Sequence, residues 1–280
     1  SRRAACPISC LLLDSDFEVW ALVGRRADSP GLQSFEGKVG KLISTGIDGL
    51  LDSDVEFEGV FDATSAFDHR KHWDLMSKEG KWMVDLTPSR IGKPFVPELL
   101  GKVSGMDMSE DFVTNYSMVT CGGQSSGPLL YAMSQYSSGI SEVEVSSSIA
   151  SLSAGPATRR NIDQYIQSTE NLIQVITGCS AVKAILVLNP AEPPVMMRTT
   201  VHMKVSDYAL DAIKLEAHGI VPRLKRYVPG YDIVVEPFGP NLGQIPATAK
   251  LRGAEYLLPD EHGNVYLLSA EAVEPARALS

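Results

Sequence analysis

A cysteine followed by two glycines is the feature of this sequence best suited to chemistry. The β-prone run 116–120 leads directly into Cys121, so we expect the thiol where a strand ends and the backbone turns sharply. Gly122 and Gly123 lack the Cβ atoms that would block a substrate, and their N–H groups are expected to point at a developing oxyanion. The stretch predicts a nucleophilic Cys121. The competing interpretation is that a lone cysteine is a small core residue.

The cysteines as a set indicate a reducing compartment. Their spacing contains no CxxC pair, which fits neither a disulfide scaffold nor a zinc site, so no metal is expected. The short apolar run 11–13 meets Asp14 without a cleavage site, and no segment approaches the roughly 20 apolar residues of a membrane span. We therefore expect a cytoplasmic protein without a membrane anchor, in which the cysteines are Cys6, Cys10, Cys121 and Cys179.

Length and composition are typical of a globular enzyme with two domains. The chain has 280 residues, of which 44% are hydrophobic and 21% are charged, which excludes a disordered chain. Its formal net charge is −9, and it has no long runs of Lys or Arg. A general nucleic-acid-binding function is therefore not expected.

Strands alternate with helical patterns in the first part of the chain. This order predicts parallel βαβ units, in which ligands bind at the carboxyl ends of the strands. Small or polar residues follow each strand, which predicts a nucleotide-binding crevice that Cys121 also faces. The expected strands are residues 18–24, 59–64 and 81–86, and the expected helices lie near residues 47–51 and 66–77.

The glycine-rich phosphate loop of a dinucleotide fold is not found in the sequence. Such a fold begins with a strand and a G-x-G-x-x-G turn that opens a helix. Residues 9–13 already have the pattern of that helix. Either a first strand precedes Ser1, or the phosphate loop has been lost.

The second part of the chain has a different pattern. Residues 139–151 alternate between Ile or Val and Ser or Glu, which predicts a half-buried strand. A loop of small residues, 151–163, enters a helix that runs to about residue 176. A buried strand at 183–188, a proline-rich loop, a strand at 195–205 and a helix from 206 to about 227 follow.

Five blocks in matching order resemble the acylating acetaldehyde dehydrogenases, the partners of 4-hydroxy-2-oxovalerate aldolases. The likeness extends from about Val19 to Ala272. One CGG motif would mean little, but the ordered set is specific. The blocks are Phe61-Asp62-Ala63-Thr64-Ser65-Ala66, Asp85-Leu86-Thr87-Pro88 with Ile91-Gly92, Met118-Val119-Thr120-Cys121-Gly122-Gly123-Gln124, Ser153-Ala154-Gly155-Pro156 through Asp163, and Leu188-Asn189-Pro190-Ala191-Glu192-Pro193-Pro194.

The resemblance implies a fold and a reaction. The expected fold is α/β, with a Rossmann-like domain at 1–120 that is completed by 264–280, and an α+β catalytic and dimerisation domain at 121–263. In the family, the cysteine matching Cys121 attacks an aldehyde, a hydride passes to NAD, and coenzyme A releases the acyl group from the thioester.

The resemblance also implies cofactor-binding residues. Asn161 matches the position that contacts the nicotinamide carboxamide, and Asn264 matches another asparagine on the cofactor side. Thr64 and Ser65 are expected at a strand end beside the crevice, and Ser153 and Gly155 in the loop that covers it.

One departure from the family concerns a catalytic position. Thr199 stands where the family usually has an aspartate that activates water or the thiol, and threonine is no base near neutral pH. His202 follows in the same strand, and imidazole titrates near neutrality. We expect His202 either to face the site as a replacement base or to be a buried, hydrogen-bonded histidine. His69, His72 and His218 are expected on the surface or on helices.

Two functional hypotheses follow from the sequence. The first is an NAD-dependent acylating aldehyde dehydrogenase, an oxidoreductase that also uses coenzyme A. The second is a divergent relative without hydride transfer, which uses Cys121 for other thiol or acyl chemistry or serves as the partner subunit of an aldolase-like protein. The family further implies a homodimer and an aldolase subunit that passes the aldehyde through a channel.

Overall fold

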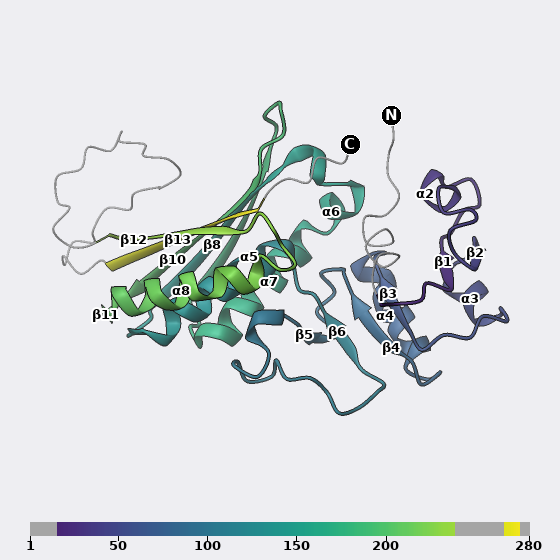
Figure 1. The fold of residues 1–280 in the computed structure, drawn as a ribbon, viewed down its shortest axis with the longest axis horizontal. Helices are drawn as coiled ribbons and strands as arrows, with labels where there is room; N and C mark the ends of the chain where they lie inside the picture. The colour runs from purple at the N-terminus through teal and green to yellow at the C-terminus, as the bar shows by residue number, and fades with distance from the viewer. Residues whose placement is uncertain (1–15, 239–265, 275–280) are drawn as a thin grey trace.

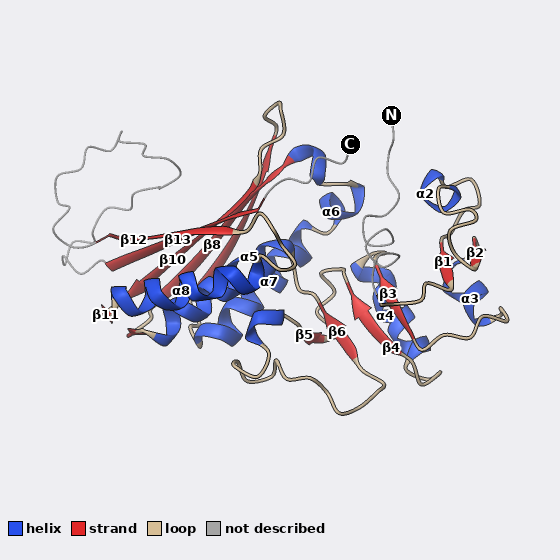
Figure 2. Ribbon diagram, in the orientation of Figure 1, coloured by secondary structure: helices blue, strands red, loops and turns tan. Residues whose placement is uncertain are grey.

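The computed structural model describes residues 16–238 and 266–274, which form two α/β portions side by side along the long axis (Figure 1). The first portion contains parallel strands, and the second contains a large mixed sheet with helices packed on it (Figure 2). The predicted fold class is confirmed. In these described residues, no helix is long and apolar enough to cross a membrane.

The first portion has the predicted parallel βαβ character. All its strand pairs are parallel, and Asp62 and Asp85 are paired at the carboxyl ends of neighbouring strands. One sheet has the order β1-β2 and the other the order β3-β4-β6-β5. The strands are β1 (Ala21–Val23), β2 (Lys41–Ile43), β3 (Gly59–Asp62), β4 (Trp82–Asp85), β5 (Lys93–Pro94) and β6 (Asn115–Ser117), and the helices are α2 (Pro30–Gln33), α3 (Gly46–Leu51), α4 (Ala66–Met76) and the 3₁₀ turn η1 (Pro97–Leu99).

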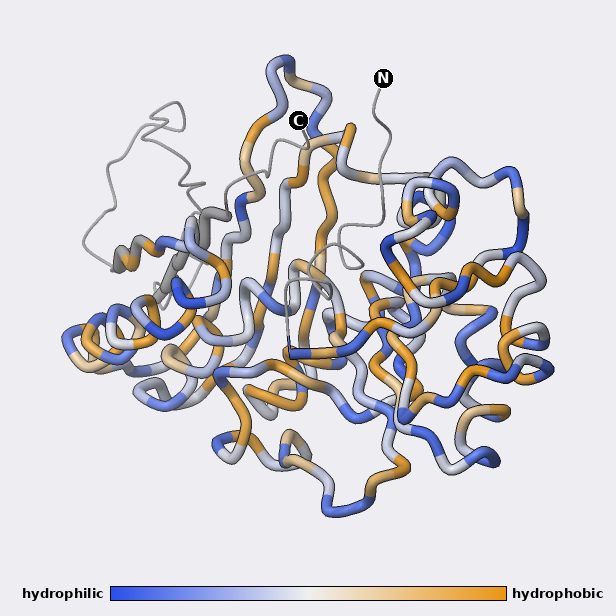
Figure 3. Tube along the Cα trace, turned by 45° about the vertical axis from the view of Figure 1, so that its right-hand side comes forward, coloured by the Kyte–Doolittle hydropathy of each residue, from blue (hydrophilic) through white to orange (hydrophobic). Residues whose placement is uncertain are grey.

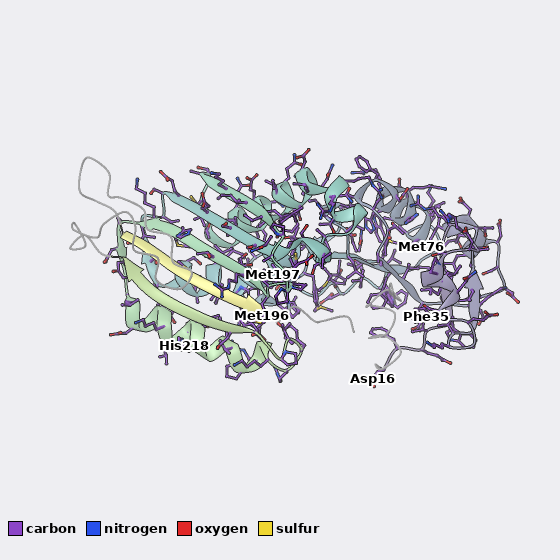
Figure 4. All side chains as sticks on the ribbon, turned by 90° about the horizontal axis from the view of Figure 1, so that it is seen from above. Asp16, Phe35, Met76, Met196, Met197 and His218 are labelled. Carbon is purple, nitrogen blue, oxygen red and sulfur yellow. The ribbon has the colours of Figure 1, made fainter. Side chains whose placement is uncertain are left out.

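A small apolar core holds this portion together. Ile47, Met76 and Met83 are buried and belong to one cluster between its helices and strands. Phe35 and Met76 lie at the end of the molecule opposite His218 of the second portion (Figure 4). This portion therefore has a core of its own, separate from the larger core beside the second sheet.

The second portion is built on a five-stranded sheet with the order β12-β13-β10-β8-β9. Its neighbours pair antiparallel except for β8 and β9, which are parallel. The strands are β8 (Glu142–Ala150), β9 (Val182–Asn189), β10 (Met197–Val205), β12 (Asp232–Phe238) and β13 (Tyr266–Glu274), and the short pair β7 (Ser137–Ser138) and β11 (Asp207–Tyr208) lies apart. The helices are α5 (Cys121–Gln135), α6 (Pro156–Arg160), α7 (Ile162–Thr177) and α8 (Leu210–Leu224), with the 3₁₀ turn η2 (Ser151–Ser153).

The helices α5, α7 and α8 pack on the same face of this sheet (Figure 1). Val145, Val201 and Met203 point to that face and are completely buried in one cluster with residues of the three helices. Because side chains alternate along a strand, the residues between them point to the other face. Figure 3 shows how hydrophobic and hydrophilic stretches follow one another along the chain.

Two expectations about the second portion are wrong. Residues 264–280 were expected to complete the first domain, but β13 pairs with β10 and β12 in the second sheet. The run 183–188 was expected to be buried, but β9 is an edge strand and Val187 is 45% exposed. An apolar run alone does not distinguish a central strand from an edge strand. The predicted domain boundary near residue 120 stays a prediction, and residues 9–13 lie outside the described residues.

Candidate active site

Cys121 is held at the start of a helix by the turn that precedes it. β6 ends at Ser117, Val119 adopts a left-handed backbone with φ of 53°, and Thr120 caps α5, whose first residue is Cys121. The side-chain amide of Gln124 donates hydrogen bonds to the carbonyls of Met118 and Phe95, at 2.8 and 2.6 Å. The thiol is exposed. The expected strand end with a sharp turn before the cysteine is confirmed.

The two glycines after Cys121 have a different role from the one expected. The N–H of Gly122 donates to Oη of Tyr165 at 3.1 Å, and that of Gly123 donates to Oγ1 of Thr120 at 2.9 Å. These N–H groups therefore do not point freely at a substrate, and that expectation is wrong. A Cβ atom on Gly122 would lie 2.1 Å from Tyr165 Oη, so close packing against the tyrosine requires a glycine there.

A chain of buried hydroxyls extends from Cys121 into the protein. Sγ of Cys121 lies 3.9 Å from Oη of Tyr165 on α7, and Oη is hydrogen-bonded to Ser147 on β8. Oγ of Ser147 lies 3.1 Å from Oγ1 of Thr199 on β10, which accepts a hydrogen bond from Ser125 of α5 at 2.7 Å. Thr199 is completely buried. The structure thus joins Thr199 to Cys121 through two intermediate side chains.

Tyr165 stays protonated in this environment. Burial is the largest cause, and the charge of nearby Cys121 adds to it, so the pKa of Tyr165 is raised well above its ordinary value. The hydrogen bonds from Ser147 and from the N–H of Gly122 oppose this shift. A neutral phenol has one proton to donate and can accept hydrogen bonds at the same time.

His202 lies away from this group. It is the neighbour of Val201 and Met203, whose side chains face the helices, so the imidazole points to the opposite face of the sheet. The sheet separates it from α5 and Cys121. The expectation that His202 faces the site as a base is therefore wrong, while the alternative of a buried histidine agrees with its 7% exposure.

Asn161 and the loop before it lie one helical turn from Tyr165. The carbonyl of Asn161 accepts the N–H of Tyr165 at 2.9 Å, and Asn161 is buried. Ser153 is exposed in η2, and a Cβ atom on Gly155 would meet no described atom within 4 Å. Arg159 shapes this loop by donating to the carbonyls of Ala154 and Ser151, each at 3.0 Å. Asn264 lies outside the described residues.

Thr64 and Ser65 lie at the carboxyl edge of the first parallel sheet. The hydroxyl of Thr64 donates to Asp62 at 2.6 Å, and Ser65 caps α4 by accepting the N–H of Asp68. After the adjacent strand β4, the hydroxyl of Thr87 is buried and has no hydrogen-bond partner among the described residues. An edge with hydroxyls after neighbouring strands, one of them unsatisfied, fits a dinucleotide bound across it.

A buried cluster of charged and polar groups lies beneath this edge, and the sequence did not reveal it. His69 was expected on the surface or on a helix; it lies on helix α4 and is completely buried. Its Nδ1 lies 2.8 Å from a carboxylate oxygen of Asp62, and its Nε2 lies 3.5 Å from Asp85 and 2.9 Å from the amide of Asn115. His72 contacts the same oxygen of Asp62 at 2.8 Å. The spacing of His69 and His72 on one helix face, after a strand ending in aspartate, was the available signal.

The pKa values of the two carboxyl groups in this cluster, Asp62 and Asp85, are shifted in opposite directions. Burial raises the pKa of Asp62, but hydrogen bonds from His69, His72 and Thr64 outweigh it and hold that pKa well below its ordinary value. Burial raises the pKa of Asp85, and the hydrogen bond from Ser89 and the charge of His69 only partly compensate. The cluster links the ends of β3, β4 and β6 to α4.

Comparisons with known proteins found relatives that cover most of this chain. A family model described as prokaryotic acetaldehyde dehydrogenase, dimerisation, matches residues 121–259. An acetaldehyde dehydrogenase of Pectobacterium atrosepticum is 37% identical over 257 residues, covering 92% of this chain and 85% of the relative. One of Spirochaeta aurantia is 38% identical over 256 residues, covering 91% and 84%. Aspartate semialdehyde dehydrogenase II of Vibrio cholerae aligns over 92% of both chains, with 10% identity and a TM-score of 0.45.

Proposed function

The chain belongs to the acetaldehyde dehydrogenase family, and on that premise we propose that it interconverts an aldehyde and its acyl-coenzyme A thioester with NAD. The protein is thus an oxidoreductase. The observation that carries the proposal is Cys121, exposed at the first turn of α5 and supported by the turn before it. A helix N-terminus stabilises a thiolate, which is the reactive form of cysteine.

Cys121 supplies the nucleophile. Addition of its thiolate to the aldehyde carbon forms a C–S bond and turns the carbonyl oxygen into the alkoxide of a thiohemiacetal. Loss of a hydride from that carbon leaves a thioester on Cys121. Transfer of the acyl group to a second thiol breaks the C–S bond and regenerates the thiolate. The N-terminal end of α5 favours the negative charge that appears on sulfur and oxygen in these steps.

The cofactors would bind around Cys121, through the residues that the family resemblance implies. When bound, NAD accepts the hydride. Thr64, Ser65 and the unsatisfied hydroxyl of Thr87 would hold it at the carboxyl edge of the first sheet. Asn161 would contact its nicotinamide end, with Ser153 and Gly155 in the covering loop and Asn264 on the cofactor side. Coenzyme A supplies the second thiol.

The dimerisation region supports a homodimer. We propose that the copies meet through the face of the second sheet that α5, α7 and α8 leave open. An aldolase subunit that delivers the aldehyde through a channel is a further proposal, supported only by the family. A cytoplasmic location stays a prediction that rests on the cysteine content.

Oxidation of NADH that depends on an acyl-coenzyme A tests the proposed function. We expect the full chain to show this activity, and Cys121→Ser to reduce it by at least about a thousandfold, because the covalent intermediate cannot form. Cys179, the other cysteine among the described residues, is buried away from the turn, and Cys179→Ser should keep most of the activity.

Titration with NAD separates the two hypotheses. A parent protein that shows no saturable NAD binding would contradict hydride transfer and favour the relative without redox chemistry. Thioester-dependent NADH oxidation that survives in Cys121→Ser would instead overturn the role of the cysteine.

A further inference from the structure

The shortest bond of the hydroxyl chain behind Cys121 sets a direction of hydrogen bonding along it. Each hydroxyl has a single proton. The hydroxyl of Ser125 lies 2.7 Å from Oγ1 of Thr199 and 3.2 Å from the carbonyl oxygen of Gly122. Donation to the nearer Thr199 leaves the proton of Thr199 for Ser147 and that of Ser147 for Tyr165. These side chains come from α5, β10, β8 and α7, which meet at the first turn of α5 (Figure 1). All of them are buried, which shields the bonds from bulk water.

This direction leaves the proton of Tyr165 for Cys121. Oη of Tyr165 already accepts from Ser147 and from the N–H of Gly122. The nearby sulfur of Cys121, at 3.9 Å, is the remaining acceptor. Hydrogen bonds at catalytic groups are often long before substrate binds and shorten in the complex.

We propose that Tyr165 is a positioning residue for Cys121: its O–H donates to the thiolate, and Ser147, Thr199 and Ser125 fix the direction of that donation. The proposal rests on the proposed function, in which Cys121 is the nucleophile. It gives Thr199 a role that needs no charge. A carboxylate at this completely buried position would require a partner, whereas a hydroxyl accepts from Ser125 and donates to Ser147.

Alkylation of Cys121 by iodoacetamide as a function of pH tests this role without cofactor or substrate. The rate is followed by mass spectrometry of the peptide that contains Cys121, so the other cysteines do not interfere. Tyr165→Phe keeps the ring and removes Oη. Because a hydrogen bond to a charged group contributes about 1.5–3 kcal/mol, we expect the midpoint of the alkylation curve to move up by about one to two pH units.

Two further variants complete the experiment. Tyr131→Phe, on the outer part of α5 next to Lys102, should keep the parent curve. Ser147→Ala removes one bond to Oη and should move the midpoint in the same direction by a smaller amount. Circular dichroism checks whether Tyr165→Phe folds. If it does not, the test rests on Ser147→Ala.

The proposal would be overturned if the alkylation curves of Tyr165→Phe and Ser147→Ala both had the same midpoint as the curve of the parent. That result leaves the proposed function intact, because thioester-dependent NADH oxidation by the parent is measured separately. Conversely, the midpoints of the two variants could be shifted while the parent shows no thioester-dependent NADH oxidation. That result would contradict the proposed function and leave the pairing of Tyr165 with Cys121 standing.

Discussion

The hydroxyl of Tyr165 and the hydrogen atoms of Gly122 share one small space at the first turn of α5. The glycine lets α7 approach, and its N–H donates to the phenol oxygen. Ser147 approaches from the sheet side, and a Cβ atom on Gly122 would also lie 2.6 Å from its Oγ. The same residue therefore sets both the packing of α5 on α7 and the position of the group nearest the thiol.

Gly122→Ala should disturb the site more than the fold. The added methyl group must displace Oη of Tyr165, which moves the phenol away from Cys121. We expect thioester-dependent NADH oxidation to fall about tenfold or more, since misplacement of a positioning group by about 1 Å has effects of this size. Gly219→Ala is the matched control, because a Cβ atom there meets nothing within 4 Å. Equal activity of the two variants would contradict the packing argument.

At the scale of elements, the buried cluster around His69 connects α4 to the carboxyl ends of β3 and β4 and to the start of β6. Asp62 ends β3 and Asp85 ends β4, while Asn115 begins β6. Asp62 combines burial with several hydrogen bonds, so its charge is stabilised only in the folded state. The cluster therefore holds the edge at which Thr64, Ser65 and Thr87 are proposed to meet the cofactor.

The pH dependence of stability should reveal the contribution of Asp62. Its pKa is lower in the folded than in the unfolded state, so its stabilisation is complete above about pH 4 and is lost as the pH falls below that value. Asp85 acts in the opposite sense, because a raised pKa favours folding at lower pH. The midpoint of urea unfolding should fall less steeply with acid in Asp62→Asn than in the parent.

The control for this measurement is Asp211→Asn, an exposed position on α8. It should keep the slope of the parent. An Asp62→Asn curve parallel to the parent curve would show that Asp62 does not link folding to protons in this range.

At the scale of the whole molecule, α5, α7 and α8 cover one face of the second sheet, and no described helix packs on the other face, which we call the open face. Thr200 and His202 point to the open face, and across it Glu144 pairs with Lys183 at 3.6 Å. The family model that matches 121–259 describes a dimerisation region, and this sheet makes up much of that region. A second copy on the open face would give the sheet a layer on each side.

Thr200→Arg should weaken the dimer. The longer charged side chain would project from the middle of the open face, and burying it without a partner is unfavourable. Sedimentation velocity should show a shift toward monomer, whereas Leu215→Lys, at a position on α8 that is 78% exposed, should leave the dimer unchanged. A Thr200→Arg protein that stays as dimeric as the parent would place the interface elsewhere.

The sequence alone determined the fold class and the order of most elements, and it predicts Cys121 as the nucleophile. Period-2 and helical patterns are local properties, and the CGG motif with its ordered neighbours identifies Cys121 without coordinates. Local patterns also predicted the turn before Cys121, because glycines are depleted in strands and a pair of them marks the end of the β-prone run.

Only the tertiary structure decided which side chains meet. Ser125, Ser147, Tyr165 and Thr199 are far apart in the chain and come together because α5 and α7 pack on the face of β8 and β10. The same packing directs Thr199 toward Cys121 and His202 away from it, although they are three positions apart on one strand. Two residues separated by an odd number of positions on a strand point to opposite faces of the sheet. Which of these faces the helices cover is settled only when the sheet is assembled.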